Sequence, residues 1–233
     1  MHPLDNVIWN ALSTRQTHLA ESFGQARRFI PAVTSLGGLP ANTPEAYESL
    51  VGLLSTGDDV RLVLDQPYQE RPGLNLIASA PLLQMVCENG GLPGSQAGSD
   101  AEFVELGAGD SPAMVELAEL TKPGPFDKRT YEFGTFLGIR PDGRLAAMAG
   151  ERLKVPGYTE VSAVCTHPEH TGRGYARVLM TEVMRRIRSR GEVPFLHVRE
   201  DNTRAIELYQ RLGFRVRQRS QLAVVRKQNR EEV

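Results

Sequence analysis

The second half of the chain has the clearest pattern of apolar and polar positions. From residue 102 onward this pattern predicts the element order β-α-β-β-β-α-β-α-β. The predicted helices span 111–121, 175–190 and 203–212, and the predicted strands span 103–106, 133–140, 144–153, 160–166, 193–198 and 214–225. Helices that alternate with strands in this way are typical of a mixed α/β layer fold.

The first 88 residues have a weaker pattern. It predicts a helix over 7–23, a second helix that begins at Thr43-Pro44, and strands over 60–64 and 74–86. The stretch that follows is rich in Gly, Ser and Pro and is typical of a linker. We therefore predict an additional N-terminal α/β domain over 1–88, a linker over 89–101, a second domain over 102–226, and a tail over 227–233.

Composition excludes several classes of protein. The chain has 233 residues, of which 40% are hydrophobic and 24% charged, values typical of a globular protein rather than a disordered one. No apolar run approaches the ~18 residues that a membrane-spanning helix needs, and the N-terminus does not resemble a signal peptide. Cys87 and Cys165 suggest neither a disulfide framework nor a zinc site. We expect a cytoplasmic protein, a monomer or homodimer, with no membrane partner.

The net charge of −1 hides an asymmetry. Residues 173–230 carry a net charge of +10, nearly all from arginine, whereas residues 1–172 carry −9. Arginine suits contacts with phosphate, so nucleic acid is one candidate partner. The aromatic residues of the basic region are better explained by helices and core than by a base-stacking surface, and we therefore predict no nucleic-acid partner.

A glycine-rich turn is the first stretch that could carry chemistry. A predicted strand ends near Thr166, and a predicted helix begins at Tyr175, directly after Gly172 and Gly174. Glycines allow close approach of a ligand, and the first turn of a helix has free N–H groups that bind phosphate oxygens. Taken alone, this stretch could equally be an ordinary tight turn.

The second stretch runs from Asn202 to Phe214. Asn202 and Tyr209 lie seven positions apart and therefore face the same side of the predicted helix. Asn202 also fits a plain helix N-cap, and Tyr209 fits a half-buried packing residue.

Together, in this order, the two stretches resemble the motifs of the GNAT superfamily of acyl-CoA-dependent N-acetyltransferases, in its FR47-like form. The resemblance covers roughly residues 102–225 and implies the GNAT fold for the second domain. It also implies acetyl-CoA as co-substrate and a primary amine, on a small or amino-acid-like molecule, as acceptor. The family usually has Gln or Arg where this chain has Thr171. Residues 1–88 could be a degenerate copy of the same fold that covers the acceptor side.

The resemblance also implies roles for single residues. The backbone N–H of Val164 would hold the developing oxyanion, and Tyr209 would protonate the departing thiolate. Asn202 would contact the cofactor arm, and Cys165 and Thr166 would flank pantetheine. The pyrophosphate would lie against the turn formed by Thr171, Gly172, Arg173, Gly174, Tyr175 and Ala176.

A base must accept the amine proton, and Glu160 is the candidate, because it precedes Gly174 by the 14 positions found in histone-acetylating members. The alternative is a solvated carboxylate at a strand end. His197 is expected to be structural. His167 and His170 do not suggest a metal site, because Pro168 opposes a helix between them. The second candidate function is a non-catalytic module that binds acyl-CoA.

Overall fold

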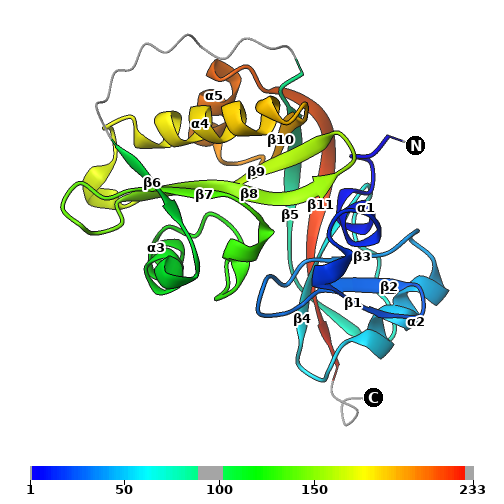
Figure 1. Ribbon diagram of the computed structural model, residues 1–233. Coiled ribbons are helices and arrows are strands. Elements are labelled where there is room, and N and C mark those ends of the chain that lie inside the picture. The colour runs from blue at the N-terminus through cyan, green and yellow to red at the C-terminus, as the bar shows by residue number, and fades with distance from the viewer. Residues whose placement is uncertain (1, 89–101, 229–233) are drawn as a thin grey trace.

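A computed structural model describes residues 2–88 and 102–228 (Figure 1). Its helices are α1 (Val7–Ser13), α2 (Pro44–Leu53), α3 (Ser111–Thr121), α4 (Tyr175–Ser189) and α5 (Thr203–Arg211). Its strands are β1 (Ala20–Phe23), β2 (Ala26–Phe29), β3 (Gly37–Gly38), β4 (Asp59–Leu64), β5 (Leu74–Val86), β6 (Phe103–Leu106), β7 (Phe136–Ile139), β8 (Ala147–Val155), β9 (Tyr158–Thr166), β10 (Val193–Arg199) and β11 (Arg215–Lys227). The mixed α/β fold class is confirmed. None of the helices in these residues is both long and apolar enough to cross a membrane.

The eight-stranded sheet has the order β4-β11-β5-β10-β9-β8-β7-β6. Its neighbouring strands are antiparallel except for β9 and β10, which are parallel. Figure 1 shows α4 on one side of the sheet and α3 on the other. The apolar stripe of α4 explains its position, because Leu179, Val183 and Ile187 are fully buried.

Strand β5 changes the predicted domain organisation. It pairs with both β10 and β11, so a strand from residues 1–88 lies in the middle of the sheet. One apolar cluster also joins Val7 and Leu12 of α1 to Met114 of α3 and Met148 of β8. Residues 1–88 therefore share a sheet and an apolar cluster with the rest of the chain, and the domain boundaries stay a prediction. The predicted linker and most of the predicted tail lie outside the described residues.

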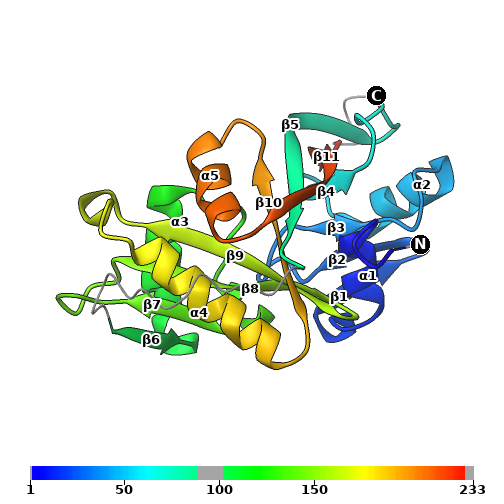
Figure 2. The same cartoon turned by 90° about the horizontal axis from the view of Figure 1, so that it is seen from above.

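The helix predicted over 7–23 is wrong beyond Ser13. A run of polar residues follows, in which the Thr14 hydroxyl donates to the carbonyl of Asn10 and competes with further helix. Residues 20–38 instead form the small three-stranded sheet β1-β2-β3. Its strands are only two to four residues long, which is too short for an alternating hydrophobic pattern to reveal them. Seen from above, this small sheet lies beside β4, the strand at one edge of the large sheet (Figure 2).

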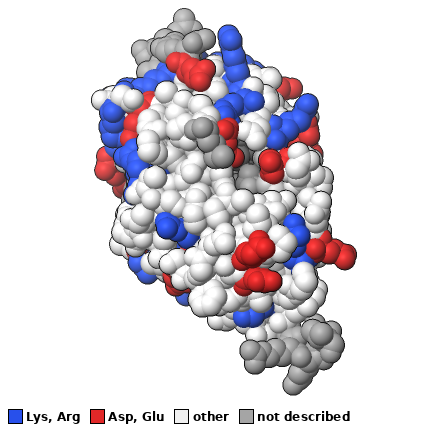
Figure 3. All heavy atoms as spheres, turned by 90° about the vertical axis from the view of Figure 1, so that its right-hand side faces the viewer, with Lys and Arg blue, Asp and Glu red and all other residues white. Residues whose placement is uncertain are grey.

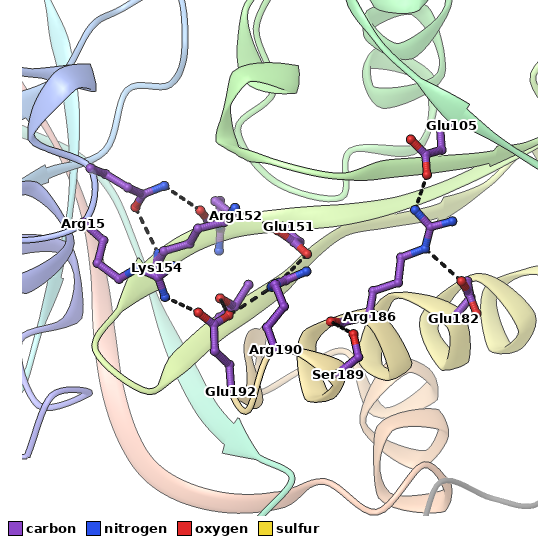
Figure 4. Close-up of polar contacts among 12 residues, drawn as sticks. Arg15, Glu105, Glu151, Arg152, Lys154, Glu182, Arg186, Ser189, Arg190 and Glu192 are labelled. Atoms are coloured by element: carbon purple, nitrogen blue, oxygen red, sulfur yellow. Dashed lines mark hydrogen bonds and ion pairs between the residues drawn. The ribbon is translucent and has the colours of Figure 1, made fainter.

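Polar contacts attach the segment between α1 and β1 to the β8–β9 hairpin and to the residue before β10. The buried side chain of Gln16 donates to the carbonyl of Arg152 at 2.8 Å and accepts from the N–H of Lys154 at 3.0 Å. Nearby, Arg15 forms an ion pair with Glu192 at the start of β10 (Figure 4). These contacts fix the segment between α1 and β1 against the strands that carry the candidate site.

Candidate active site

Strands β9 and β10 separate partway along their length. Their parallel register covers only Tyr158–Glu160 against Val193–Phe195. Beyond this point, β9 continues along β8, and β10 continues along β5. The sheet is therefore open between two central strands, where backbone groups can reach a ligand.

A cavity of about 710 Å³ lies at this opening. Three of the predicted site residues line it, namely Val164 on β9 together with Asn202 and Tyr209 at the two ends of α5. The loop that follows α3 contributes residues 122–126, and the N-terminal part contributes Ile8, Leu36, Arg61, Val63 and Leu82. Its volume lies in the range typical of small-molecule sites.

A bulge in β9 is next to this opening. Ala163 has a φ of +52°, which a residue with a Cβ rarely adopts. The register between β8 and β9 gives neither Ala163 nor Val164 a partner, although Ser162 and Cys165 on either side have one. A left-handed alanine costs on the order of 1 kcal/mol, and such strain is concentrated at functional sites.

The glycine turn is open to solvent. Thr171, Gly172, Arg173 and Gly174 are all exposed. Gly172 and Gly174 both have a φ of +79°, and an added Cβ at either would meet no heavy atom within 4 Å. The 15-residue helix α4 begins directly after Gly174, so its free N–H groups face this turn. Exposed backbone donors and the helix dipole suit the diphosphate of coenzyme A.

Several predicted ligand contacts lie beside the cavity rather than in its wall. Cys165 is buried, and burial raises the pKa of its thiol to about 11, so it is not a reactive thiolate. Tyr175 is also buried and stacks near His170. The Thr171 hydroxyl donates to the carbonyl of Pro168 at 3.0 Å. Neither Thr166 nor Ala176 is among the residues that line the cavity.

Tyr209 keeps its proton in this environment. Burial raises the pKa of its phenol to about 12, and nearby Cys165 adds to the rise. Asn202 caps α5, because its side-chain oxygen accepts from the N–H of Ala205 at 3.2 Å. The cap holds Asn202 two helical turns from Tyr209, both facing the cavity.

The structure contradicts the predicted role of Glu160 as base. Its side chain is fully buried and accepts two 2.8 Å hydrogen bonds from the Arg152 guanidinium. His197 Nδ1 lies 2.7 Å from the same carboxylate. Burial alone would raise the pKa of Glu160, but Arg152 and His197 outweigh burial and lower it to about 2. A carboxylate with so low a pKa is a very weak base, and both of its oxygens already accept hydrogen bonds, so Glu160 is a structural anion.

The sequence patterns did not indicate the partners of Glu160. The hairpin turn after Val155 places Lys154 opposite Thr159, so the register itself brings Arg152 near Glu160. The short hairpin between β8 and β9 is a local sequence signal that could have indicated this contact. The contact of His197 agrees with its predicted structural role, and its Nε2 lies 3.2 Å from the Gln84 amide nitrogen.

Three metal-ligating side chains meet beside the glycine turn. His167, Glu169 and His170 have donor atoms within 4.8 Å of one another, on a 3-10 turn that begins at Pro168. The expected absence of a metal site stays a prediction.

Much of the positive charge of the C-terminal region is paired. Carboxylates form ion pairs with Arg185, Arg186, Arg190, Arg199, Arg211, Arg217, Arg219 and Arg226. Figure 3 shows charges of both signs interspersed on one face, with uncharged surface between them. This pairing weakens the case for a phosphate-binding surface outside the cavity region.

Comparison with known proteins places these features in a family. Residues 136–223 match the family model of FR47-like proteins. A solved structure of a protein assigned to the GNAT family of acetyltransferases, from Novosphingobium aromaticivorans, is 42% identical to this chain. It superimposes with a TM-score of 0.89 over 98% of this chain and 100% of its own.

Two characterised relatives match shorter segments. The N-alpha-acetyltransferase RimI of Mycobacterium tuberculosis is 38% identical over 82 residues, which cover 34% of this chain and about half (51%) of the relative. The [ribosomal protein bS18]-alanine N-acetyltransferase of Salmonella typhimurium is 29% identical over 116 residues, or 47% of this chain and 77% of the relative.

Proposed function

Because this chain belongs to the GNAT family of N-acetyltransferases, we propose that it moves the acetyl group of acetyl-CoA directly to a primary amine. The observation that carries the proposal is the cavity between β9 and β10, which Val164, Asn202 and Tyr209 line together. Acetyl-CoA supplies an acetyl group activated as a thioester. The open glycine turn before α4 fits its diphosphate, since nothing fills the space beside Gly172 or Gly174.

Three residues of this chain stabilise the oxyanion, protonate the departing thiolate and orient the co-substrate. The N–H of Val164, which has no register partner on β8, holds the negative charge that develops on the acetyl oxygen. Tyr209 gives its proton to the departing thiolate, because its raised pKa keeps the phenol protonated. Asn202 orients the arm of the co-substrate at the cavity mouth.

Water in the cavity accepts the amine proton in this scheme. We do not assign the role of base to Glu160, because its carboxylate is paired with Arg152 and the pair lowers its pKa to about 2. His197 is occupied on both ring nitrogens, by Glu160 and by Gln84. The acceptor therefore reacts as the neutral amine that its own pKa allows at a given pH.

This proposal predicts a pH profile that depends on the acceptor. We expect the rising limb of kcat/KM to move with the pKa of the acceptor amine, by roughly two units or more between a peptide N-terminus and a lysine-type amine. Thiol release from acetyl-CoA over pH 6–10, with two acceptors of different pKa, measures it. A limb at the same pH for both would show that a group of the chain acts as the base.

A substitution in the glycine turn tests acetyl-CoA binding. Gly174→Ala forces a methyl group into a backbone with a φ of +79° at the predicted diphosphate site. We expect the KM for acetyl-CoA to rise by about tenfold, which corresponds to losing ~1.4 kcal/mol of binding. Gly157→Ala is the matched control, because Gly157 has a φ of +80° and equally open surroundings at the other end of β9. An equal KM in both variants would remove the turn from the binding site.

The alternative function, a module that binds acyl-CoA without catalysis, has a distinct outcome. Calorimetry would detect acetyl-CoA binding, weakened by Gly174→Ala, while no amine of a broad panel releases free thiol. Turnover of any amine would dismiss this alternative. The cytoplasmic location and the monomeric or dimeric state stay predictions.

A further inference from the structure

We propose that the end of the cavity formed by the N-terminal part binds a carboxylate through Arg61, so that the acceptor is an amine that also carries a carboxylate and an apolar group. The proposal rests on the proposed function, since it names the acceptor class of the same cavity. It starts from Arg61, a residue that the sequence patterns did not single out.

The fold holds the Arg61 side chain toward the cavity. Val60 and Leu62, its neighbours on β4, are buried in the core on the opposite face. Arg61 and Val63 alternate with them and line the cavity. The N–H of Arg61 donates to the carbonyl of Ser35 at 2.8 Å, and its guanidinium is bonded to the Ser35 hydroxyl. These two contacts orient the guanidinium before any ligand arrives.

Arg61 differs from the other guanidinium groups of the cavity. Arg152 is paired with Glu160, and Arg199 is paired with Asp201. Arg61 has no carboxylate within 4.0 Å in the part of the chain that the structure describes. An arginine with one polar partner and a partly desolvated position retains donors that suit a planar carboxylate.

Asp127 and Asp59 are the two carboxylates that feel the charge of Arg61. Burial raises the pKa of Asp127, and the attraction of Arg61 offsets the rise only in part. Neither carboxylate forms an ion pair with Arg61, and Asp59 is paired with Arg226 instead. Exposed Glu119 and Lys122 also line the cavity, and their opposite charges balance. The unpaired positive charge of Arg61 therefore makes this end of the cavity favour a ligand with an anionic group.

The walls around Arg61 are apolar. They are formed by Ile8, Leu36, Val63, Leu82 and Leu222, with Phe126 from the loop that follows α3. A charged group surrounded by apolar walls favours a ligand with one carboxylate and one hydrocarbon side chain. Apolar amino acids and short apolar peptides match this description.

The test compares acids with their amides. Wild type and Arg61→Gln are assayed with leucine and leucinamide as acceptors, and calorimetry with coenzyme A present measures binding of N-acetylleucine and N-acetylleucinamide. We expect wild type to favour the acid over the amide at least tenfold in kcat/KM, expressed per concentration of neutral amine, and in Kd. Arg61→Gln should lose this preference, with unchanged acetyl-CoA affinity and an unchanged thermal melt. Arg61→Lys should keep part of it.

Arg219→Gln is the control, because Arg219 lies on the neighbouring strand, pairs with Glu200 and does not line the cavity. It should retain the full preference. Turnover of amides as fast as acids by wild type would overturn the carboxylate site and leave the proposed function standing. Arg61-dependent binding of N-acetylleucine without turnover of any amine would support the carboxylate site and overturn the proposed function. The absence of both binding and acid preference would also overturn the carboxylate site.

Discussion

Tyr209→Phe is expected to lower kcat by about 100-fold, a typical contribution of a general acid, without changing the affinity for acetyl-CoA. The phenol lies in the cavity at the far end of α5 from Asn202, and burial holds its pKa at about 12. The hydroxyl is therefore protonated throughout the working range of pH. Phenylalanine keeps the ring that packs near Phe214 at 6.2 Å but has no proton to donate to the departing thiolate.

Tyr158→Phe provides the matched control. Tyr158 lies at the paired start of β9, and its hydroxyl is 3.1 Å from His2 Nε2, away from the cavity. Removing that hydroxyl should leave kcat within a factor of about two, because no reacting atom lies near it. Steady-state assays at saturating acetyl-CoA measure both variants. A Tyr209→Phe enzyme with the kcat of wild type would exclude the phenol as the acid.

Arg152→Met is expected to reduce the free energy of unfolding by about 3–5 kcal/mol, since it leaves the buried Glu160 carboxylate without its cation. The double variant Arg152→Met with Glu160→Leu should recover most of this loss, because no charge is then left unpaired. Urea denaturation at pH 7 measures all three proteins. If the single variant is as stable as wild type, Glu160 is not held by this ion pair.

The same pair makes stability depend on pH. The pKa of Glu160 is lowered from 4.5 to about 2 in the folded protein, so its stabilising effect is complete above the unfolded pKa and is lost as pH falls toward 2. A shift of this size corresponds to on the order of 3 kcal/mol. Wild type should therefore lose more stability between pH 5 and pH 3 than the double variant, which lacks the carboxylate.

Short-range patterns were sufficient to find the glycine turn and the helix from Asn202 to Tyr209. In both places a strand, a turn and a helix follow one another within about twenty residues, and local periodicity reports them directly. The position of β5 could not be found in this way, because it pairs with β10 and β11 more than a hundred residues later. Arg61 was missed for the same reason: only the tertiary fold brings β4 to the cavity.

The error at Glu160 has a different origin. Its distance from Gly174 matched a family pattern, but spacing along the chain does not report what lies across the hairpin. The Arg152 guanidinium decides the state of that carboxylate, and the pairing of β8 with β9 brings the two side chains together. A residue of the right type at the right position can thus serve the architecture instead of the chemistry.

The central place of β5 also affects how the chain folds during its synthesis. Its neighbours on both sides, β10 and β11, leave the ribosome long after it does, so this central strand must wait while more than a hundred further residues are synthesised. Non-local pairing of this kind slows folding and leaves unpaired backbone available to wrong partners. During synthesis, the nascent chain is therefore most vulnerable to aggregation in the interval before its last strand arrives.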